Sequence, residues 1–189
     1  MRRYVLLAGV NGAGKSTLFS LLPSLRDIEK INFDETLREI GDWRDNKAVV
    51  EAGKIVIEKI NDYFNRGISF SQETTLCGKS IFRNIQRAKE LGYSIEMHYV
   101  GLDSPNTAKI RVKNRVAQGG HGIADEDIER RYVESLENIK AVLQQCDLAA
   151  IYDNTVGFRR FAIYKSGKCI RLSTQTPLWY QQTMCEDDR

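Results

Sequence analysis

The sequence is poor in residues that tie a small fold together through covalent bonds or metal. Its 189 residues include three prolines, two histidines and four cysteines. The cysteines form no C-x-x-C pair, and neither histidine stands at zinc-ligand spacing from them, which argues against a structural zinc site. We expect four free thiols, as is usual in a reducing cytoplasm, at Cys77, Cys146, Cys169 and Cys185.

Long apolar stretches are also missing. A membrane helix needs about 18 consecutive apolar residues, whereas the longest run here, Tyr4–Val10, has the length of a β-strand. The basic residues before it resemble the start of a signal peptide, but the apolar run is too short and leads directly into a motif that the mature protein needs. We therefore predict a cytoplasmic protein without a membrane span.

Neither sign of charge dominates. Lys and Arg total 28 against 25 Asp and Glu, which leaves a net charge of +3. A protein that binds long nucleic acids needs a broad basic face, so a nucleic-acid partner is not expected. Hydrophobic residues make up 42% of the chain, enough for a compact core, and we expect residues 1–189 to form a single domain.

Apolar strands alternate with helical segments along the chain. Strands are predicted at Tyr4–Ala8, Glu29–Phe33, Ile68–Gln72, Ser94–Leu102 and Ala149–Asp153, and helices at Lys15–Leu22, Thr36–Ile40, Asp45–Phe64 and Lys79–Leu91. This alternation is typical of an α/β protein with a parallel five-stranded sheet flanked by helices. Phe161–Tyr164 and Cys169–Leu172 predict a C-terminal β-hairpin.

Residues 104–145 interrupt the alternation. Two helices, Ser104–Val116 and Asp125–Gln145, follow one another with a glycine-rich loop and no strand between them. Pro105 begins the first helix, and three acidic residues begin the second, both of which suit a helix N-terminus. We interpret this helical pair as a lid.

The segment Gly9–Ser16 fits the phosphate-binding pattern G-x-x-x-x-G-K-[ST] in full, between a strand and a helix. Its glycines let several backbone N–H groups point at one anion, and the helix adds its N-terminal dipole. Lys15 reaches the β- and γ-phosphates, and the Ser16 hydroxyl can ligate Mg²⁺. We predict nucleoside triphosphate binding by Gly9, Asn11, Gly12, Ala13, Gly14, Lys15, Ser16 and Thr17.

The P-loop leaves three classes of protein open: a small-molecule kinase, an ATPase that drives motion, and a GTPase switch. The sequence has no L-S-G-G-Q segment and no long strand that ends in adjacent acids. The nearest string to the guanine-reading N-K-x-D element, Asn46–Val49, has Val49 where an Asp is needed. A kinase needs a carboxylate base, an acceptor pocket and clamping arginines, and the chain has candidates for all three.

The candidate carboxylates follow two predicted strands. Asp34 is predicted to end the second strand, where the C-termini of parallel strands meet the ligand; the alternative is a helix N-cap. Glu73 and Thr75 end the third strand at the same rim and can bond a substrate rich in hydroxyl groups. The alternative for these two is an ordinary polar strand end.

The candidate arginines lie in the lid. Four of residues 109–115 are Lys or Arg, and Arg111 and Arg115 share one helix face at i, i+4 spacing. Arg130 and Arg131 follow on the second helix. Such a charge run is usually a solvated face, but its place in a lid favours a clamp for phosphates.

Together these segments resemble the zeta-toxin-like P-loop kinases, most closely their short bacterial branch. The resemblance spans about residues 3–155 and is carried by the P-loop, Ile31–Glu35, Glu73–Leu76, Arg111–Val116, Gly119–His121, Arg130–Tyr132 and Ile151–Asn154. It implies a kinase-like P-loop NTPase fold and an enzyme that uses ATP and Mg²⁺. The best-known members phosphorylate the 3′-hydroxyl of the N-acetylglucosamine part of UDP-N-acetylglucosamine and are restrained by an antitoxin that blocks the ATP site.

Matching positions in the resemblance imply roles for single residues. Asp34 becomes the catalytic base, Lys15 and Ser16 bind ATP and Mg²⁺, and Glu73 and Thr75 hold the sugar. Asn154 would lie beside the adenine, with an ordinary Asn turn as the alternative.

The resemblance leaves the lid arginines less defined. The larger toxins place a second phosphate-binding arginine after the first lid helix, where residues 118–128 here contain none. We therefore expect Arg115 and Arg130 in catalysis and Arg111 and Arg131 on the substrate. Two other functions stay open: a kinase of another small metabolite or of a nucleic-acid end, and a nucleotide-binding module with little transfer.

Overall fold

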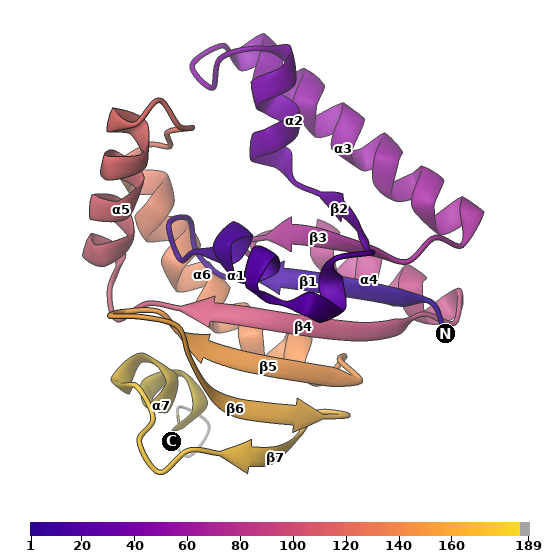
Figure 1. Ribbon diagram of the computed structural model, residues 1–189, viewed down its shortest axis with the longest axis vertical. Coiled ribbons are helices and arrows are strands. Elements are labelled where there is room, and N and C mark those ends of the chain that lie inside the picture. The colour runs from indigo at the N-terminus through magenta and orange to yellow at the C-terminus, as the bar shows by residue number, and fades with distance from the viewer. Residues whose placement is uncertain (186–189) are drawn as a thin grey trace.

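The computed structural model describes residues 1–185 and contains one seven-stranded sheet (Figure 1). The strands are β1 (Arg3–Ala8), β2 (Glu29–Ile31), β3 (Phe70–Thr74), β4 (Ser94–Gly101), β5 (Leu148–Asp153), β6 (Arg159–Lys165) and β7 (Lys168–Leu172). Their order is β2-β3-β1-β4-β5-β6-β7, and the first five are parallel. The predicted α/β fold is confirmed, but the sheet has seven strands rather than five because the C-terminal hairpin joins it. Strand β6 pairs antiparallel with β5, and β7 pairs antiparallel with β6.

Helices cover both faces of this sheet. They are α1 (Lys15–Leu21), α2 (Phe33–Ile40), α3 (Asn46–Arg66), α4 (Ser80–Glu90), α5 (Pro105–Ala117), α6 (Asp125–Leu143) and α7 (Leu178–Cys185). Strand β1 is the middle one of the five parallel strands and is buried on both faces. Tyr4 and Leu6 join the core under α3, α4 and α6, whereas Val5 and Leu7 pack with Leu25 on the other face. This explains why β1 is continuously apolar.

Strand β3 begins later than the expected range Ile68–Gln72. Gly67 ends α3 in the left-handed conformation, and the N–H of Ile68 bonds back to a carbonyl of the last helical turn. Ile68 therefore belongs to the helix cap, and the strand runs from Phe70 to Thr74. As a result Glu73 lies within the strand instead of after it.

Strand β2 ends at Ile31 instead of Phe33, and the difference moves the candidate base. The Asn32 side chain caps α2: its Oδ1 accepts hydrogen bonds from the backbone N–H groups of Asp34 (2.8 Å) and Glu35 (3.3 Å). Asp34 is thus in the first turn of α2, and the expectation that it ends a strand is wrong. The alternative, that Asp34 is a helix N-cap, is wrong by two residues, because the N-cap of α2 is Asn32.

The lid helices α5 and α6 are packed firmly. The C-terminal half of α6 contributes Ile139, Val142 and Leu143 to the main core, and Val112 and Ile128 pack against the P-loop region. In Figure 1, α5 stands beside the C-terminal ends of the parallel strands, across from α2. Within residues 1–185, no helix combines the length and the apolar character needed to cross a bilayer.

Candidate active site

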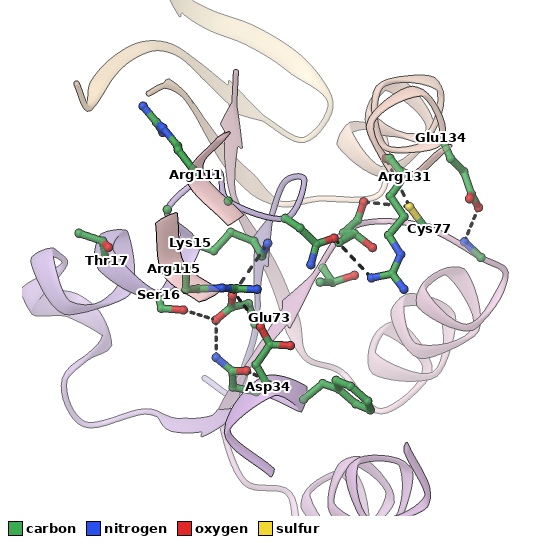
Figure 2. A pocket seen from close by; sticks show the side chains of 18 of the residues that line it. Lys15, Ser16, Thr17, Asp34, Glu73, Cys77, Arg111, Arg115, Arg131 and Glu134 are labelled. Carbon is green, nitrogen blue, oxygen red and sulfur yellow. Dashed lines mark hydrogen bonds and ion pairs between the residues drawn. The ribbon is translucent and has the colours of Figure 1, made fainter. Parts of the chain in front are cut away.

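A cavity of about 760 Å³ opens at the C-terminal ends of β1 and β3 (Figure 2). The P-loop, the first turn of α2, the end of β3 and both lid helices line it. All predicted site residues border this cavity except Gly9, Ala13 and Asn154. The fold therefore gathers side chains from distant parts of the sequence around one space.

The P-loop fits tightly against its surroundings. Gly9 and Gly14 have φ angles of 134° and 97°, which favour glycine. A Cβ atom on Gly9 would lie 2.2 Å from the Val100 carbonyl oxygen, and one on Gly14 would lie 2.7 Å from Nδ2 of Asn154. The Asn154 amide donates a 2.8 Å hydrogen bond to the Ala13 carbonyl, so Asn154 braces the loop from behind.

Lys15 lies under the loop that carries it. Its side chain is 7% exposed, and Nζ donates hydrogen bonds to the carbonyls of Gly9 (2.9 Å) and Val10 (3.1 Å). Burial lowers the pKa of Lys15, and the nearby carboxylates of Glu73 and Asp34 oppose that change. An ammonium group under a glycine-rich loop at a helix N-terminus is suited to meet a polyphosphate.

Glu73 joins three elements of the site. Its Oε2 accepts hydrogen bonds from the Ser16 hydroxyl (2.9 Å) and from Nδ2 of Asn32 (2.7 Å), and its Oε1 lies 3.9 Å from Nζ of Lys15. A hydroxyl beside a carboxylate supplies the oxygen ligands that Mg²⁺ prefers. Sequence reasoning missed Asn32, although the spacing Asn32-x-x-Glu35 resembles that of a capping box and could have identified it.

The candidate base, Asp34, faces a guanidinium group and an imidazole from the lid. Nη1 of Arg115 donates a 3.2 Å hydrogen bond to Oδ2 of Asp34, and Nε2 of His121 lies 3.7 Å from Oδ1. The Nε and Nη2 atoms of Arg115 are buried without a hydrogen-bond partner among the described residues. Unsatisfied buried donors are costly, so this half of the guanidinium group fits an anionic ligand such as a transferring phosphate.

The other three lid arginines differ in placement. Arg131 is half-buried and its Nη1 donates to Oδ1 of Asn11 at 3.3 Å, within the P-loop. Arg130 is exposed and pairs with Asp127 (2.7 Å) and Glu134 (3.3 Å) on its own helix. Arg111 donates to backbone carbonyls, including that of Asn154 at 2.7 Å, and points away from the carboxylates (Figure 2).

Two further cavity residues were not found from the sequence. Glu134 Oε1 accepts a 2.6 Å hydrogen bond from the Gly78 N–H, and Cys77 Sγ lies 3.5 Å from the carbonyls of Thr75 and Arg131. Burial raises the pKa of the Cys77 thiol, which disfavours the thiolate. These residues connect the segment after β3 to α6, a long-range contact with no local sequence signal. Cys77, Cys146 and Cys169 are free thiols, and the side chain of Cys185 lies outside the described residues.

The strand order β2-β3-β1-β4-β5, with the phosphate loop after β1, defines a P-loop kinase fold. The zeta toxin family model matches residues 2–168, and the chain belongs to this family.

The chain is also similar to a protein sequence and to several solved structures. An uncharacterized protein of Haemophilus influenzae is 33% identical over 128 residues, which cover 68% of this chain and 91% of the relative. A chain of the native AvrRxo1-ORF1:-ORF2 complex has a TM-score of 0.70 at 14% identity, and the match covers 97% of this chain and 63% of that one. A chain of the same complex with ATP has a TM-score of 0.66 at 12% identity, and the match covers 90% of this chain and 60% of that one.

A chain of the PezAT toxin–antitoxin system of Streptococcus pneumoniae has a TM-score of 0.62 at 16% identity, covering 98% of this chain and 78% of that one. Identities this low show a shared fold alone. The chain spans less than two thirds of the AvrRxo1 complex chains that it matches.

Proposed function

We propose that this protein transfers the γ-phosphoryl group of ATP to a hydroxyl group of a nucleotide-activated sugar of the UDP-N-acetylglucosamine type. The observation that carries this proposal is the position of Asp34 and Arg115 across one cavity from the P-loop lysine, Lys15. A carboxylate, a partly unsatisfied guanidinium group and a phosphate loop are the parts that phosphoryl transfer to an alcohol requires.

The reaction follows from the placement of these groups. The acceptor hydroxyl donates to Asp34, and its oxygen attacks the γ-phosphorus while the proton moves to the carboxylate. The bond between the γ-phosphorus and the β–γ bridging oxygen breaks, and ADP leaves. Lys15, Arg115 and Arg131 stabilise the charge on the transferring group. Mg²⁺ bound with ATP at Ser16 would neutralise phosphate charge.

Glu73 has a role at the Mg²⁺ ligand and a role at the sugar. Its Oε2 is held by the Ser16 hydroxyl and the Asn32 amide, so it fixes the residue that would ligate Mg²⁺. Among residues 1–185, the Lys15 ammonium at 3.9 Å is the one partner of Oε1, which remains able to accept a hydrogen bond from a hydroxyl of the sugar, together with Thr75. Arg131 is better placed than Arg130 for the phosphates because it contacts the P-loop at Asn11.

The partner proposed for this enzyme is an antitoxin that covers the ATP site. Membership of the zeta toxin family and the fold shared with a chain of a toxin–antitoxin system support it. Co-purification of the chain with the product of an adjacent gene, and its loss of ATP binding in that complex, would test this part of the proposal.

The decisive experiment offers radiolabelled ATP and a panel of acceptors to the purified chain. UDP-sugars, free sugars, nucleosides and oligonucleotides are compared, and the product is identified by mass. We expect label on UDP-N-acetylglucosamine, and none in the Asp34→Asn variant although that variant still binds ATP. Label found only on another acceptor would identify that acceptor as the substrate in place of UDP-N-acetylglucosamine. ATP binding without any labelled product would overturn the kinase proposal.

A further inference from the structure

The loop that joins the two lid helices, residues 118–124, docks on the segment between α2 and α3. It carries His121, whose Nε2 lies 3.7 Å from Oδ1 of Asp34. The other carboxylate oxygen, Oδ2, is bonded by Arg115 from the end of α5. Both oxygens of one carboxylate therefore face side chains of the lid, one charged guanidinium group and one imidazole.

Close backbone packing fixes the position of His121. A Cβ atom on Gly120 would lie 2.5 Å from Cγ of Arg115, and one on Gly122 would lie 2.5 Å from the Trp43 indole. The ring of His121 packs edge-on against Trp43, with centroids 6.0 Å apart and an interplanar angle of 65°. The two glycines let the loop pass between Arg115 and Trp43 in contact with both.

Asp34 separates two cavities. On one side is the P-loop cavity, and on the other is a smaller cavity of about 260 Å³ whose walls include Arg38, Trp43 and His121. The lid loop thus forms a wall beside the carboxylate on the side away from the P-loop. Any movement of this loop would change the surroundings of Asp34 directly.

The imidazole is flanked mainly by positive charge. Its side chain is 15% exposed. Burial lowers the pKa of His121, the Arg115, Arg131 and Arg38 guanidinium groups of α5, α6 and α2 lower it further, and the Asp34 carboxylate opposes them. A lowered pKa favours the neutral form of the ring at pH 7. A neutral ring can orient a carboxylate without the loss of basicity that a second adjacent cation would cause.

We propose that His121 is a positioning residue for Asp34, which it holds for proton transfer when the lid loop is docked on Trp43. The proposal rests on the proposed function for the role of Asp34 as base. When His121 is protonated at acid pH, the imidazolium group and Arg115 occupy both oxygens of Asp34. The carboxylate then no longer accepts the hydroxyl proton readily, so turnover falls on the acid side.

Nuclear magnetic resonance titration of the histidine Cε1–H signals tests the coupling without any acceptor. The chain has only two histidines, so His98 serves as an internal reference. We expect Asp34→Asn to move the midpoint of His121 to lower pH, because the variant removes the carboxylate that stabilises the imidazolium. Asp42→Asn is the matched control: Asp42 lines the same small cavity but pairs with Arg44. Equal midpoints in the two variants would overturn the coupling.

Kinetics with UDP-N-acetylglucosamine as the probe test the positioning role. We expect His121→Ala to lower kcat about tenfold with an unchanged KM for ATP. His121→Gln keeps a donor near the Nε2 position and restores most of kcat, and the acid limb of its kcat profile moves to lower pH. Equal loss in both variants with a matching fall in Tm, or no loss in either, would overturn the role.

The failure of this inference is distinguishable from failure of the proposed function. A wild-type chain that makes no product from any acceptor overturns the proposed function, and the titration of His121 then decides the Asp34 coupling by itself. An active wild-type chain with an insensitive His121 leaves the kinase proposal intact and overturns only the positioning role.

Discussion

The hydroxyl of Ser16 donates a 2.9 Å hydrogen bond to a carboxylate oxygen of Glu73, which joins the P-loop helix to the neighbouring strand β3. The same oxygen also accepts from the Asn32 amide at 2.7 Å. The predicted Mg²⁺ ligand is therefore held in place by a carboxylate that is itself oriented by the cap of α2. Groups that orient metal ligands in this way affect both metal affinity and activity.

The first prediction concerns this contact. Glu73→Gln retains an acceptor for Ser16 but removes the negative charge, so we expect phosphoryl transfer to fall about 10- to 100-fold and the Mg²⁺ requirement to rise. Initial rates across a Mg²⁺ titration measure both effects. Glu134→Gln is the control, since Glu134 borders the same cavity but accepts from the Gly78 backbone. A Glu73→Gln enzyme with the wild-type Mg²⁺ dependence would contradict the role.

The second prediction compares two adjacent arginines. Arg131 contacts the P-loop residue Asn11, whereas Arg130 pairs with two carboxylates on the helix surface. We expect Arg131→Ala to lower kcat about 100-fold, because it removes a donor that stabilises the transferring phosphoryl group. Arg130→Ala should change kcat less than about threefold, since exposed ion pairs contribute little. A larger loss of kcat in Arg130→Ala than in Arg131→Ala would mean that Arg130, and not Arg131, binds the transferring phosphoryl group.

Much of the fold could be predicted because its signals are local. The P-loop is one contiguous motif between a buried strand and a helix, and the apolar run Tyr4–Ala8 has the composition of a central strand. The boundaries of β2 and β3 were misplaced because capping decided them. Asn32 caps the start of α2 and Gly67 caps the end of α3, and each cap takes up residues that the apolar pattern assigns to a strand.

The site was harder to predict where it depends on helix phase or on contacts distant in sequence. Successive residues on a helix point about 100° apart, so only the buried face of α6 decides between Arg130 and Arg131. Ile128, Ser135 and Ile139 are buried at helical spacing, and Arg131 lies on the same face of α6 as these residues. That periodicity could have favoured Arg131. The contact between Trp43 and His121 has no sequence signal, because it depends on how the lid docks.

The third prediction concerns the brace behind the P-loop. Asn154 is buried, and its amide donates a 2.8 Å hydrogen bond to the Ala13 carbonyl. Asn154→Ala leaves that carbonyl without its partner, so we expect the free energy of unfolding to fall by about 1–3 kcal/mol and ATP affinity to decrease. Urea unfolding and ATP titration measure the two effects. The exposed Asn106 supplies the control, since Asn106→Ala should change stability by no more than about 0.5 kcal/mol. Equal stability of the two variants would show that the brace is dispensable.

The fourth prediction concerns the pH dependence of stability and lies away from the site. Glu96 on β4 bonds Nε2 of His98 at 2.7 Å and pairs with the Arg3 guanidinium. Burial raises the pKa of Glu96, but the hydrogen bonds from His98 and Arg3 outweigh it, so the pKa lies below its usual value of 4.5. A carboxyl group with a lowered folded-state pKa stabilises the fold above its unfolded pKa, and this contribution disappears as pH falls through the folded pKa.

Unfolding by urea at a series of pH values measures this contribution. The wild-type free energy of unfolding should rise with pH through the region just below pH 4.5, the usual pKa of this carboxyl group. In Glu96→Gln the rise should be smaller, because the amide does not titrate. Glu90→Gln is the control, since Glu90 is exposed and accepts a hydrogen bond from Gln86 on its own helix. The same slope for the wild-type chain and Glu96→Gln would mean that the unfolded chain lowers the pKa of Glu96 equally, and that the network with His98 and Arg3 adds nothing to acid stability.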